Sequence, residues 1–355
     1  MVSSFEPRNE IREMVGYHSP QVDVAVRLNT NESPFPPPQQ WVESLSEIAR
    51  SVSWNRYPDR AATQLREVIA QRHGVDPENV FVANGSNEVL QTILLTYGGH
   101  GRKVATFEPT YQMYGQIARV TGADVLVGSR RDDFTLDTDE IARVVGAEEV
   151  AVTFLANPNN PTGVIEPREN LEVLLRTTQG IVVVDEAYAE FADWSAIEMV
   201  QEAERLIVTR TFSKTLSLAA LRVGYAIGPR WMIEKLSIAV LPYHLDAFKQ
   251  AATVAALSYV DEMQQRVDAI TSERTRIEHR LQAAGMTVWP SGANFVLFRS
   301  QKQSTPSLWQ QLLGKGILVR DCGSWPRLER CLRVTVGTEA ENSLFLDAVD
   351  DLVGL

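Results

Sequence analysis

Residues 181–188 read Ile-Val-Val-Val-Asp-Glu-Ala-Tyr, so four β-branched residues are followed directly by a carboxylate. An unbroken apolar run of this length is typical of a parallel strand that is buried on both faces. Asp185 stands at the carboxyl end of this strand, and ligands of open α/β sheets bind beyond those ends. Asp185 therefore either contacts a ligand or caps the turn that follows it.

A lysine follows the next apolar run. Thr211-Phe212-Ser213-Lys214 comes after residues 206–209, and Arg222 stands shortly beyond. A lysine that forms a Schiff base needs an anchored aldehyde cofactor beside it, and two hydroxyls with a guanidinium are suited to bind that cofactor's phosphate. The alternative is a solvated lysine in a polar loop. Together with Asp185, which could keep a pyridine nitrogen protonated, the pattern favours the catalytic interpretation.

Two other strand ends carry polar loops. Residues 84–87, Asn-Gly-Ser-Asn, link a strand to a helix start, where backbone N–H groups and the helix dipole stabilise an anion such as phosphate. The alternative is an ordinary helix cap at Ser86 or Asn87. Residues 156–163, Ala-Asn-Pro-Asn-Asn-Pro-Thr-Gly, end the strand 150–155 with a dense run of turn formers, which predicts a loop of fixed shape. No Gly-x-Gly-x-x-Gly fingerprint of dinucleotide-binding proteins occurs.

Helical and strand patterns alternate through most of the chain, which predicts a doubly wound, mostly parallel α/β sheet. We expect an N-terminal arm at residues 1–35, a large domain at 36–245 and a smaller α+β domain at 246–355. The predicted strands are 80–83, 103–107, 124–127, 150–155, 181–184, 206–209, 223–227, 294–298, 317–319 and 331–336. The predicted helices are 61–73, 88–97, 111–121, 246–284, 305–313 and 339–352.

Composition restricts the class of protein. The chain has 355 residues, of which 44% are hydrophobic, and a formal net charge of −11 without a long basic stretch, which argues against a nucleic-acid partner. No apolar run is long enough to span a membrane and no signal-peptide pattern begins the chain, so we expect a cytoplasmic protein. Cys322 and Cys331 are expected to be free thiols, and the five scattered histidines give no support for a metal site.

In their order along the chain these segments resemble the fold type I pyridoxal-phosphate-dependent aminotransferases, and among them the histidinol-phosphate aminotransferase family. The resemblance covers nearly the whole chain. The motifs that carry it further are Leu-Asn-Thr-Asn-Glu-Ser-Pro at 28–34, Arg-Tyr-Pro-Asp at 56–59, Asn-Gly-Ser-Asn-Glu at 84–88, Gly-Ile-Leu-Val-Arg at 316–320 and Leu-Arg-Val-Thr-Val-Gly-Thr at 332–338.

Four positions depart from the family's pattern. Ser217 and Ala220 stand where the lysine loop usually carries glycines, and the early motif has Ser33 and then Pro36 in place of glycine. Glycine tolerates backbone angles that serine, alanine and proline do not, so the loop conformation can differ from the family's here. None of the four changes removes a reactive group.

The resemblance implies a role for each matching residue. Lys214 would form the Schiff base with pyridoxal 5′-phosphate, and Asp185 would hold the pyridine nitrogen protonated. Tyr188 and Asn157 would hydrogen-bond the phenolic oxygen of the cofactor, and Tyr111 would stack on the ring or, alternatively, pack in the core. The implied phosphate-binding residues are Gly85, Ser86, Asn87, Thr211, Ser213 and Arg222, the last of which could instead form a surface salt bridge.

On the substrate side, Arg320 and Arg333 would bind a carboxylate in one half-reaction and a phosphate monoester in the other. Either arginine could instead be solvated. Tyr17 would close the pocket, and Asn157 would also contact substrate. Tyr57 would reach the cofactor phosphate and the substrate in the site of the neighbouring subunit, which implies a homodimer.

The implied reaction is transamination between L-histidinol phosphate and 2-oxoglutarate, with glutamate and imidazole acetol phosphate as products. Three alternatives stay open at the level of sequence. They are an aromatic amino-acid aminotransferase, a phospho-amino-acid decarboxylase with the same cofactor, and a non-catalytic regulatory protein.

Overall fold

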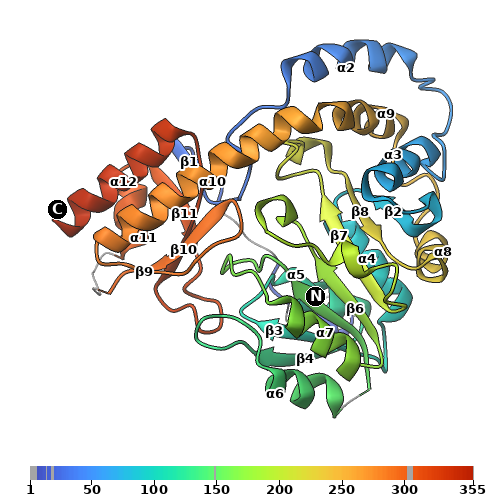
Figure 1. Cartoon of the computed structure of the whole chain (residues 1–355), viewed down its shortest axis with the longest axis horizontal. Helices are drawn as coiled ribbons and strands as arrows, with labels where there is room; N and C mark the ends of the chain where they lie inside the picture. Colours follow the sequence, from blue (N-terminus) through green and yellow to red (C-terminus); the bar gives the residue numbers. More distant parts are fainter. Residues whose placement is uncertain (1–5, 13, 17–19, 148, 302–306, 355) are drawn as a thin grey trace.

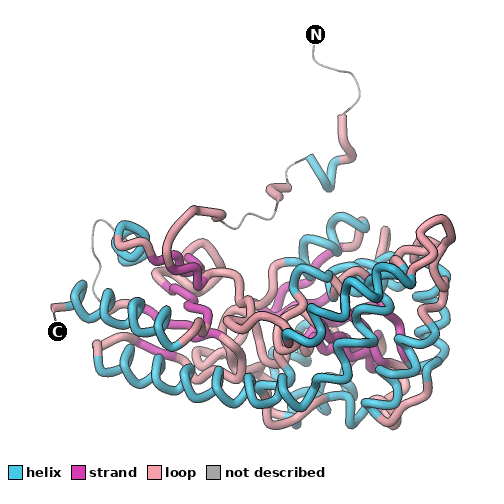
Figure 2. Tube along the Cα trace, turned by 90° about the horizontal axis from the view of Figure 1, so that it is seen from above, coloured by secondary structure: helices cyan, strands magenta, loops and turns pink. Residues whose placement is uncertain are grey.

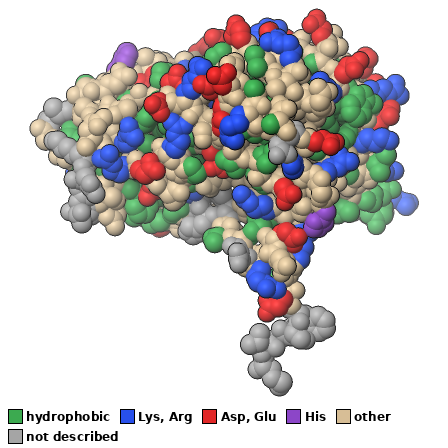
Figure 3. All heavy atoms as spheres, turned by 90° about the horizontal axis from the view of Figure 1, so that it is seen from below, with side chains coloured by type: hydrophobic (Ala, Val, Ile, Leu, Met, Phe, Trp, Pro, Cys, Tyr) green, Lys and Arg blue, Asp and Glu red, His purple; other side chains and the backbone are tan. Residues whose placement is uncertain are grey.

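Two β-sheets lie along the long axis of the molecule, with helices packed outside them (Figures 1 and 2). The computed structural model describes residues 6–12, 14–16, 20–147, 149–301 and 307–354. Within these ranges, none of the helices combines the length and apolar character that a bilayer span requires. Acidic and basic side chains are interspersed on the face shown in Figure 3, so positive charge is not gathered into one patch there.

The larger sheet has seven strands in the order β2-β8-β7-β6-β5-β3-β4. Neighbouring strands are parallel except at β8, which runs antiparallel to β2 and β7. The predicted mostly parallel sheet is confirmed, and each of its predicted strands lies within two residues of an observed one. The strands are β2 (Val80–Ala83), β3 (Lys103–Glu108), β4 (Asp124–Ser129), β5 (Val150–Ala156), β6 (Ile181–Asp185), β7 (Leu206–Thr211) and β8 (Gly224–Ile227).

Helices cover both faces of this sheet. The α-helices described before residue 257 are α1 (Asn9–Arg12), α2 (Gln39–Ser51), α3 (Thr63–His73), α4 (Ser86–Tyr97), α5 (Met113–Thr121), α6 (Thr138–Ile141), α7 (Arg168–Thr177), α8 (Arg230–Ala239) and α9 (Ala247–Ala256). Val182 and Val184 of β6 belong to the core that includes α3, α7 and α9, whereas Ile181 and Val183 belong to the core that includes α4, α5 and α8. The apolar run is therefore buried on both faces, as predicted.

The smaller sheet has five strands in the order β1-β11-β12-β10-β9. They are β1 (Val26–Leu28), β9 (Thr287–Val288), β10 (Phe295–Arg299), β11 (Ile317–Asp321) and β12 (Cys331–Thr335), with helices α10 (Val260–Ala283), α11 (Leu308–Gly314) and α12 (Glu339–Val353). β1 pairs in parallel with β11, so residues that we expected in an N-terminal arm form an edge of the C-terminal sheet. The predicted helix 305–313 begins in residues outside the described ranges, and its described part is α11.

Helix α10 connects the two sheets (Figure 1). Met263, near its start, packs into the core of the larger sheet, whereas Val267, Ile270 and Ile277 pack into the core of the smaller sheet. The helical region predicted at 246–284 is present as α9, a 3-10 turn at Leu257–Tyr259 and α10. The change from one core to the other thus falls inside α10.

Candidate active site

A pocket lies at the carboxyl ends of β5, β6 and β7 and is bordered by residues of β11 and β12. Strand ends of the larger sheet thereby meet side chains of the smaller one, and most of the residues that the sequence indicated come together. Those that line the pocket are Ser86, Asn87, Tyr111, Asp185, Tyr188, Thr211, Ser213, Lys214, Arg222, Arg320 and Arg333.

Three predicted site residues within the described ranges do not line this pocket. Gly85 and Asn157 adjoin residues that do. Tyr57 lies on the surface, 80% exposed, with its ring stacked on Tyr243 at 4.6 Å between centroids. Its side chain is thus directed to solvent and not into the pocket of its own chain. Tyr17 lies outside the described residues.

Lys214 extends from the loop after β7 toward the segment between β1 and α2. Its Nζ atom donates hydrogen bonds to the backbone carbonyls of Asn31 at 2.8 Å and Thr30 at 3.2 Å. Burial, together with the positive charges of Arg333 and Arg222, lowers the pKa of this amine to about 7. An amine with such a pKa is available as a nucleophile and base near neutral pH. Lys214 is therefore not a solvated surface lysine.

Asp185 is buried at the end of β6, where its Oδ2 atom accepts a hydrogen bond from the Tyr114 hydroxyl at 2.8 Å. Its Oδ1 atom has no hydrogen-bond partner among the described residues. Burial raises the pKa of this carboxyl to about 6, and the hydrogen bond from Tyr114 opposes that rise. Because a buried polar atom without a partner is costly, Oδ1 fits a ligand that supplies an N–H.

Asn157 follows β5, whose last residue, Ala156, is in register with Asp185. Its Oδ1 atom accepts a hydrogen bond from the backbone N–H of Glu166 at 2.9 Å, which sets the orientation of the side-chain amide. Its Nδ2 donor is buried and lacks a partner within the described part of the chain. An unpaired donor and an unpaired acceptor thus stand at neighbouring strand ends, as expected for residues that bind a polar aromatic ligand.

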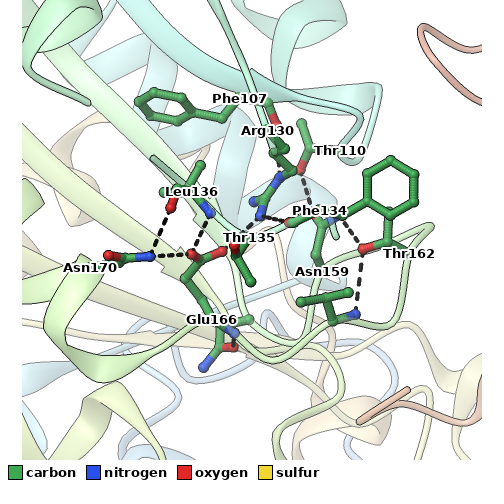
Figure 4. Close-up of polar contacts among 12 residues, drawn as sticks. Phe107, Thr110, Arg130, Phe134, Thr135, Leu136, Asn159, Thr162, Glu166 and Asn170 are labelled. Carbon is green, nitrogen blue, oxygen red and sulfur yellow. Dashed lines mark hydrogen bonds and ion pairs between the residues drawn. The ribbon is translucent and has the colours of Figure 1, made fainter. Parts of the chain in front are cut away.

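A buried ion pair supports the loop that carries Asn157 (Figure 4). Glu166 Oε2 and Arg130 Nη1 lie 2.8 Å apart, and each side chain is 1% exposed. Glu166 Oε1 accepts hydrogen bonds from the Leu136 N–H and from Asn170 Nδ2, both at 2.7 Å. Since the N–H of Glu166 binds Asn157, this network holds the amide in place. Sequence reasoning missed it because the two charges are 36 positions apart.

The other end of the pocket carries donors suited to an anion. Helix α4 begins at Ser86, and Gly85 precedes it with a φ of +82°. A Cβ atom at Gly85 would lie 2.7 Å from Nη2 of Arg222. Arg222 Nη1 donates to Ser213 Oγ at 3.2 Å, and Ser213 Oγ in turn lies 3.0 Å from Thr211 Oγ1. A helix N-terminus, two hydroxyls and a guanidinium are the groups that bind phosphate in proteins.

Two tyrosines complete the pocket wall. The Tyr111 hydroxyl donates to Asn87 Oδ1 at 3.1 Å, so the Asn87 side chain does not cap α4. The Tyr111 ring stands edge-on to Tyr114, with an interplanar angle of 82°, and part of it remains open to the pocket. The Tyr188 hydroxyl accepts a hydrogen bond from Asn31 Nδ2 at 2.9 Å. Each ring thus borders the space between Asp185 and α4.

The family model for class I and II aminotransferases matches residues 23–349. The chain belongs to this family. It is 41% identical over 351 residues to the histidinol-phosphate aminotransferase of Thermobifida fusca, a match that covers 96% of this chain and 94% of that protein. It is 42% identical over 360 residues to the histidinol-phosphate aminotransferase of Streptomyces avermitilis, with coverages of 97% and 96%.

A solved structure agrees with this placement. The histidinol-phosphate aminotransferase from Sinorhizobium meliloti, crystallised in complex with pyridoxal-5′-phosphate, has a TM-score of 0.86 to this chain at 26% identity. The superposition covers 93% of this chain and 91% of that one. The predicted fold type I architecture is confirmed.

Two departures from the family pattern contact each other in this aminotransferase. Ser217 adopts a φ of +57°, a left-handed conformation that glycine tolerates best. Its hydroxyl lies 2.8 Å from that of Ser33. Ser33 closely follows Thr30 and Asn31, whose carbonyls bind Lys214, so the pair of serines ties that segment to the lysine loop.

The two arginines of the aminotransferase pocket lie opposite each other on neighbouring strands, Arg320 on β11 and Arg333 on β12. Both are buried. Arg333 Nη2 donates to the carbonyl of Asn29 at 3.1 Å, and Nη1 contacts Asn160 Oδ1. Like charges directly opposite each other destabilise a sheet, and an anion between them would offset that repulsion. Neither arginine is solvated, and the pair is suited to bind a carboxylate or a phosphate.

Proposed function

We propose that this aminotransferase transfers an amino group between L-histidinol phosphate and 2-oxoglutarate, as a step of histidine biosynthesis. The observation that carries the proposal is the pocket itself, in which the unpaired Oδ1 atom of Asp185 lies with the amine of Lys214 and a pair of buried arginines. The unpaired Nδ2 atom of Asn157 belongs to a residue that adjoins the pocket lining. The choice of substrate is supported by relatives at 41% and 42% identity, both histidinol-phosphate aminotransferases that match over nearly their full length.

The residues of the pocket fit pyridoxal 5′-phosphate. In this proposal Asp185 Oδ1 accepts the ring N–H, Asn157 and Tyr188 donate to the phenolic oxygen, and Tyr111 contacts the ring face. The phosphate is held by Gly85, Ser86, Asn87, Thr211, Ser213 and Arg222. When bound, the cofactor withdraws electrons from the substrate's α-carbon and carries the amino group between the two substrates.

Lys214 has two roles in the proposal. It would anchor the cofactor covalently, and after the substrate displaces it, its Nζ atom would move a proton between the substrate's α-carbon and the C4′ carbon of the cofactor. The lowered pKa leaves the amine largely neutral just above neutral pH, and the carbonyls of Thr30 and Asn31 keep Nζ positioned. General acid–base catalysis of this kind contributes about 10²- to 10⁴-fold to a rate.

Arg320 and Arg333 bind the anionic end of each substrate. In histidinol phosphate that end is the phosphate monoester, and in glutamate it is a carboxylate, so one guanidinium pair serves both half-reactions. Asn157 also borders the substrate, and Tyr17 closes the pocket over it.

We further propose a homodimer in which Tyr57 reaches the site of the neighbouring subunit. Large apolar side chains near Tyr57 support this arrangement, because Trp54 is 70% exposed and Leu241 is 77% exposed. Contiguous exposed apolar patches mark protein–protein interaction sites. The stacked pair of Tyr57 and Tyr243 belongs to the same surface.

For the domains we propose a large unit that extends from residue 36 into α10 and a small unit that follows it, in place of the boundary expected at residue 245. The two cores favour placing β1 with the small unit and the change between units inside α10. The cytoplasmic location stays a prediction from the sequence.

The cofactor-loaded protein provides the test of the proposed reaction. Glutamate alone should convert the bound cofactor stoichiometrically to its pyridoxamine form, and imidazole acetol phosphate should then restore the original spectrum with release of histidinol phosphate. A phospho-amino-acid decarboxylase would release carbon dioxide and accumulate no pyridoxamine form. A non-catalytic protein would show neither conversion.

A further inference from the structure

We propose that Trp325 recognises the heteroaromatic ring of the phosphorylated substrate, as a flat surface on which the imidazole packs while Arg320 and Arg333 bind the phosphate. The inference rests on the proposed function and adds a specificity-determining residue to it. Trp325 lies in the loop between β11 and β12 and lines the pocket. No motif in the sequence had indicated it.

Trp325 differs from the other aromatic residues that line the pocket. Tyr111, Tyr114 and Tyr188 each form a hydrogen bond with a side chain at the cofactor end. Trp325 stands at the opposite end with the arginines, and the guanidinium carbon of Arg320 lies 5.8 Å from its ring centroid. An aromatic surface beside an anion-binding pair matches a substrate that has a ring and a phosphate a few bonds apart.

The loop that carries Trp325 is held in one conformation. The N–H of Cys322 donates to the carbonyl of Cys331 at 3.0 Å, and the N–H of Trp325 donates to the carbonyl of Cys322 at 2.9 Å. Farther along, Arg327 binds Asp132 Oδ1 at 2.7 Å, which attaches the loop to the larger sheet's side of the molecule. A ring presented on a fixed loop loses little conformational freedom when it binds a ligand.

Three other tryptophans form a different kind of contact. Trp41, Trp194 and Trp309 each donate the indole N–H to a backbone carbonyl, at 2.8, 3.0 and 2.9 Å. For Trp325 no hydrogen bond from the indole N–H is found among the residues that the structure describes. Its ring packs on an apolar cluster that includes Phe134 and Leu328, and the remaining surface borders the pocket.

The two half-reactions separate this role from a structural one. Histidinol phosphate has a ring and glutamate does not. A contact between Trp325 and the ring therefore stabilises only the half-reaction with histidinol phosphate. In single-turnover experiments with cofactor-loaded enzyme, we expect Trp325→Leu to lower kcat/KM for histidinol phosphate by about ten-fold, mainly through weaker binding. The glutamate half-reaction should fall less than about three-fold. Trp325→Phe, which keeps an aromatic face, should recover most of the loss.

Trp289 provides the matched control. It packs on the same apolar cluster, with its ring centroid 5.1 Å from that of Phe134, and it does not line the pocket. Trp289→Leu should change both half-reactions by the same factor. The inference is overturned if Trp325→Leu lowers both half-reactions equally, or if neither Trp325 variant changes the histidinol-phosphate half-reaction.

Equilibrium binding gives a second readout. Calorimetric titration of histidinol phosphate into the cofactor-loaded Lys214→Ala protein, with and without Trp325→Leu, should show a dissociation constant about ten-fold higher in the double variant. Equal dissociation constants would contradict the inference. Failure of the wild type to convert histidinol phosphate at all would instead refute the proposed function, so the two outcomes are distinguishable.

Discussion

At the scale of single residues, burial in the pocket disfavours the charged forms of Lys214 and Asp185. Burial lowers the pKa of Lys214 to about 7 and raises that of Asp185 to about 6, so it shifts both groups toward their neutral forms. The same burial leaves one oxygen of Asp185 and the Nδ2 donor of Asn157 without partners among the described residues. These atoms cost stability and are available for a ligand, which is the usual arrangement of a functional site.

The lowered pKa of Lys214 predicts a pH-dependent stability of the cofactor-free protein. Between pH of about 7 and the ordinary lysine value of 10.5, the unfolded chain binds more protons at this group than the native state. The free energy of unfolding should therefore rise with pH through this window, by at most about 1.4 kcal/mol per pH unit. Lys214→Met removes the group, so the difference between wild type and variant isolates it.

Denaturant unfolding of both proteins at pH 7.5 and 9.5 measures that difference. Wild type should gain roughly 2 kcal/mol relative to Lys214→Met over these two units. An unchanged difference would show that Lys214 is solvated and would remove the basis for its role as a neutral amine.

Some site residues could be located from sequence because each follows a local pattern. Asp185 and Asn157 stand directly beyond apolar runs, and Lys214 lies in the loop that follows another such run. Runs of this kind specify strands without help from the rest of the chain. Tyr114 and Glu166 could not be located in this way. Their roles depend on contacts with Asp185 and Arg130 across the fold, and nothing in their own neighbourhoods distinguishes them from an ordinary helix residue or a solvated carboxylate.

At the scale of elements, the buried pair of Glu166 and Arg130 joins the loop after β4 to the segment before α7. Glu166→Gln would leave the Arg130 charge buried and unpaired, so we expect the free energy of unfolding to fall by roughly 3–5 kcal/mol. Glu198→Gln is the matched control, since Glu198 forms an exposed pair with Arg168 at 3.2 Å and should cost less than about 1 kcal/mol. Similar losses for the two variants in chemical denaturation would refute the role of the buried pair.

The contact between Ser33 and Ser217 predicts an energetic coupling between two distant segments. In a double-mutant cycle of Ser33→Ala and Ser217→Ala, we expect a coupling of about 0.5–1.5 kcal/mol in the free energy of unfolding. Alanine keeps the Cβ atom at the left-handed position of Ser217, so the cycle reports the hydroxyl contact and not the backbone conformation. Additive effects would show that the two departures from the family pattern are unrelated.

The pattern of elements was predictable where hydrophobic periodicity is strong. Strands β2 to β8 follow from it, and so do the helices that lie between several of them. β1 did not follow, because a strand of three residues is recognisable only by its pairing with Ile317–Val319, almost 300 positions away. α2, α7 and α8 were also missed, and each has mixed charged and apolar positions with a proline instead of a polar side-chain cap at its start.

At the scale of the whole molecule, the pocket depends on two sheets that are joined by α10. The larger sheet supplies the pocket residues that would hold the cofactor, among them Asp185. The smaller sheet supplies Arg320 on β11 and Arg333 on β12, and Trp325 lies in the loop between these two strands. β1 pairs with β11 of the second sheet, and the segment that follows β1 contains Asn31, whose carbonyl accepts a hydrogen bond from Lys214. The arrangement explains why sequence patterns alone indicated the strand ends of the larger sheet, whereas Arg320 and Arg333 were indicated only by the resemblance to the family.

The proposed dimer predicts complementation between two inactive variants. Tyr57→Ala and Lys214→Ala homodimers should each have little activity, because every site lacks one residue. In hybrids one site carries both substitutions and the other carries neither, so a refolded equal mixture should recover about a quarter of wild-type activity. Activity assays and size-exclusion chromatography of the mixture test this. If a mixture that contains hybrids recovers no activity, Tyr57 does not act in the active site of the neighbouring subunit.

The most direct test of the central claim compares kcat/KM of the cofactor-loaded protein for L-histidinol phosphate with the values for phenylalanine and tyrosine, each with 2-oxoglutarate as acceptor. We expect histidinol phosphate to be preferred by at least about 100-fold, because Arg320 and Arg333 can bind a dianionic phosphate more strongly than a carboxylate. A preference for phenylalanine or tyrosine would contradict the account and identify the protein as an aromatic amino-acid aminotransferase.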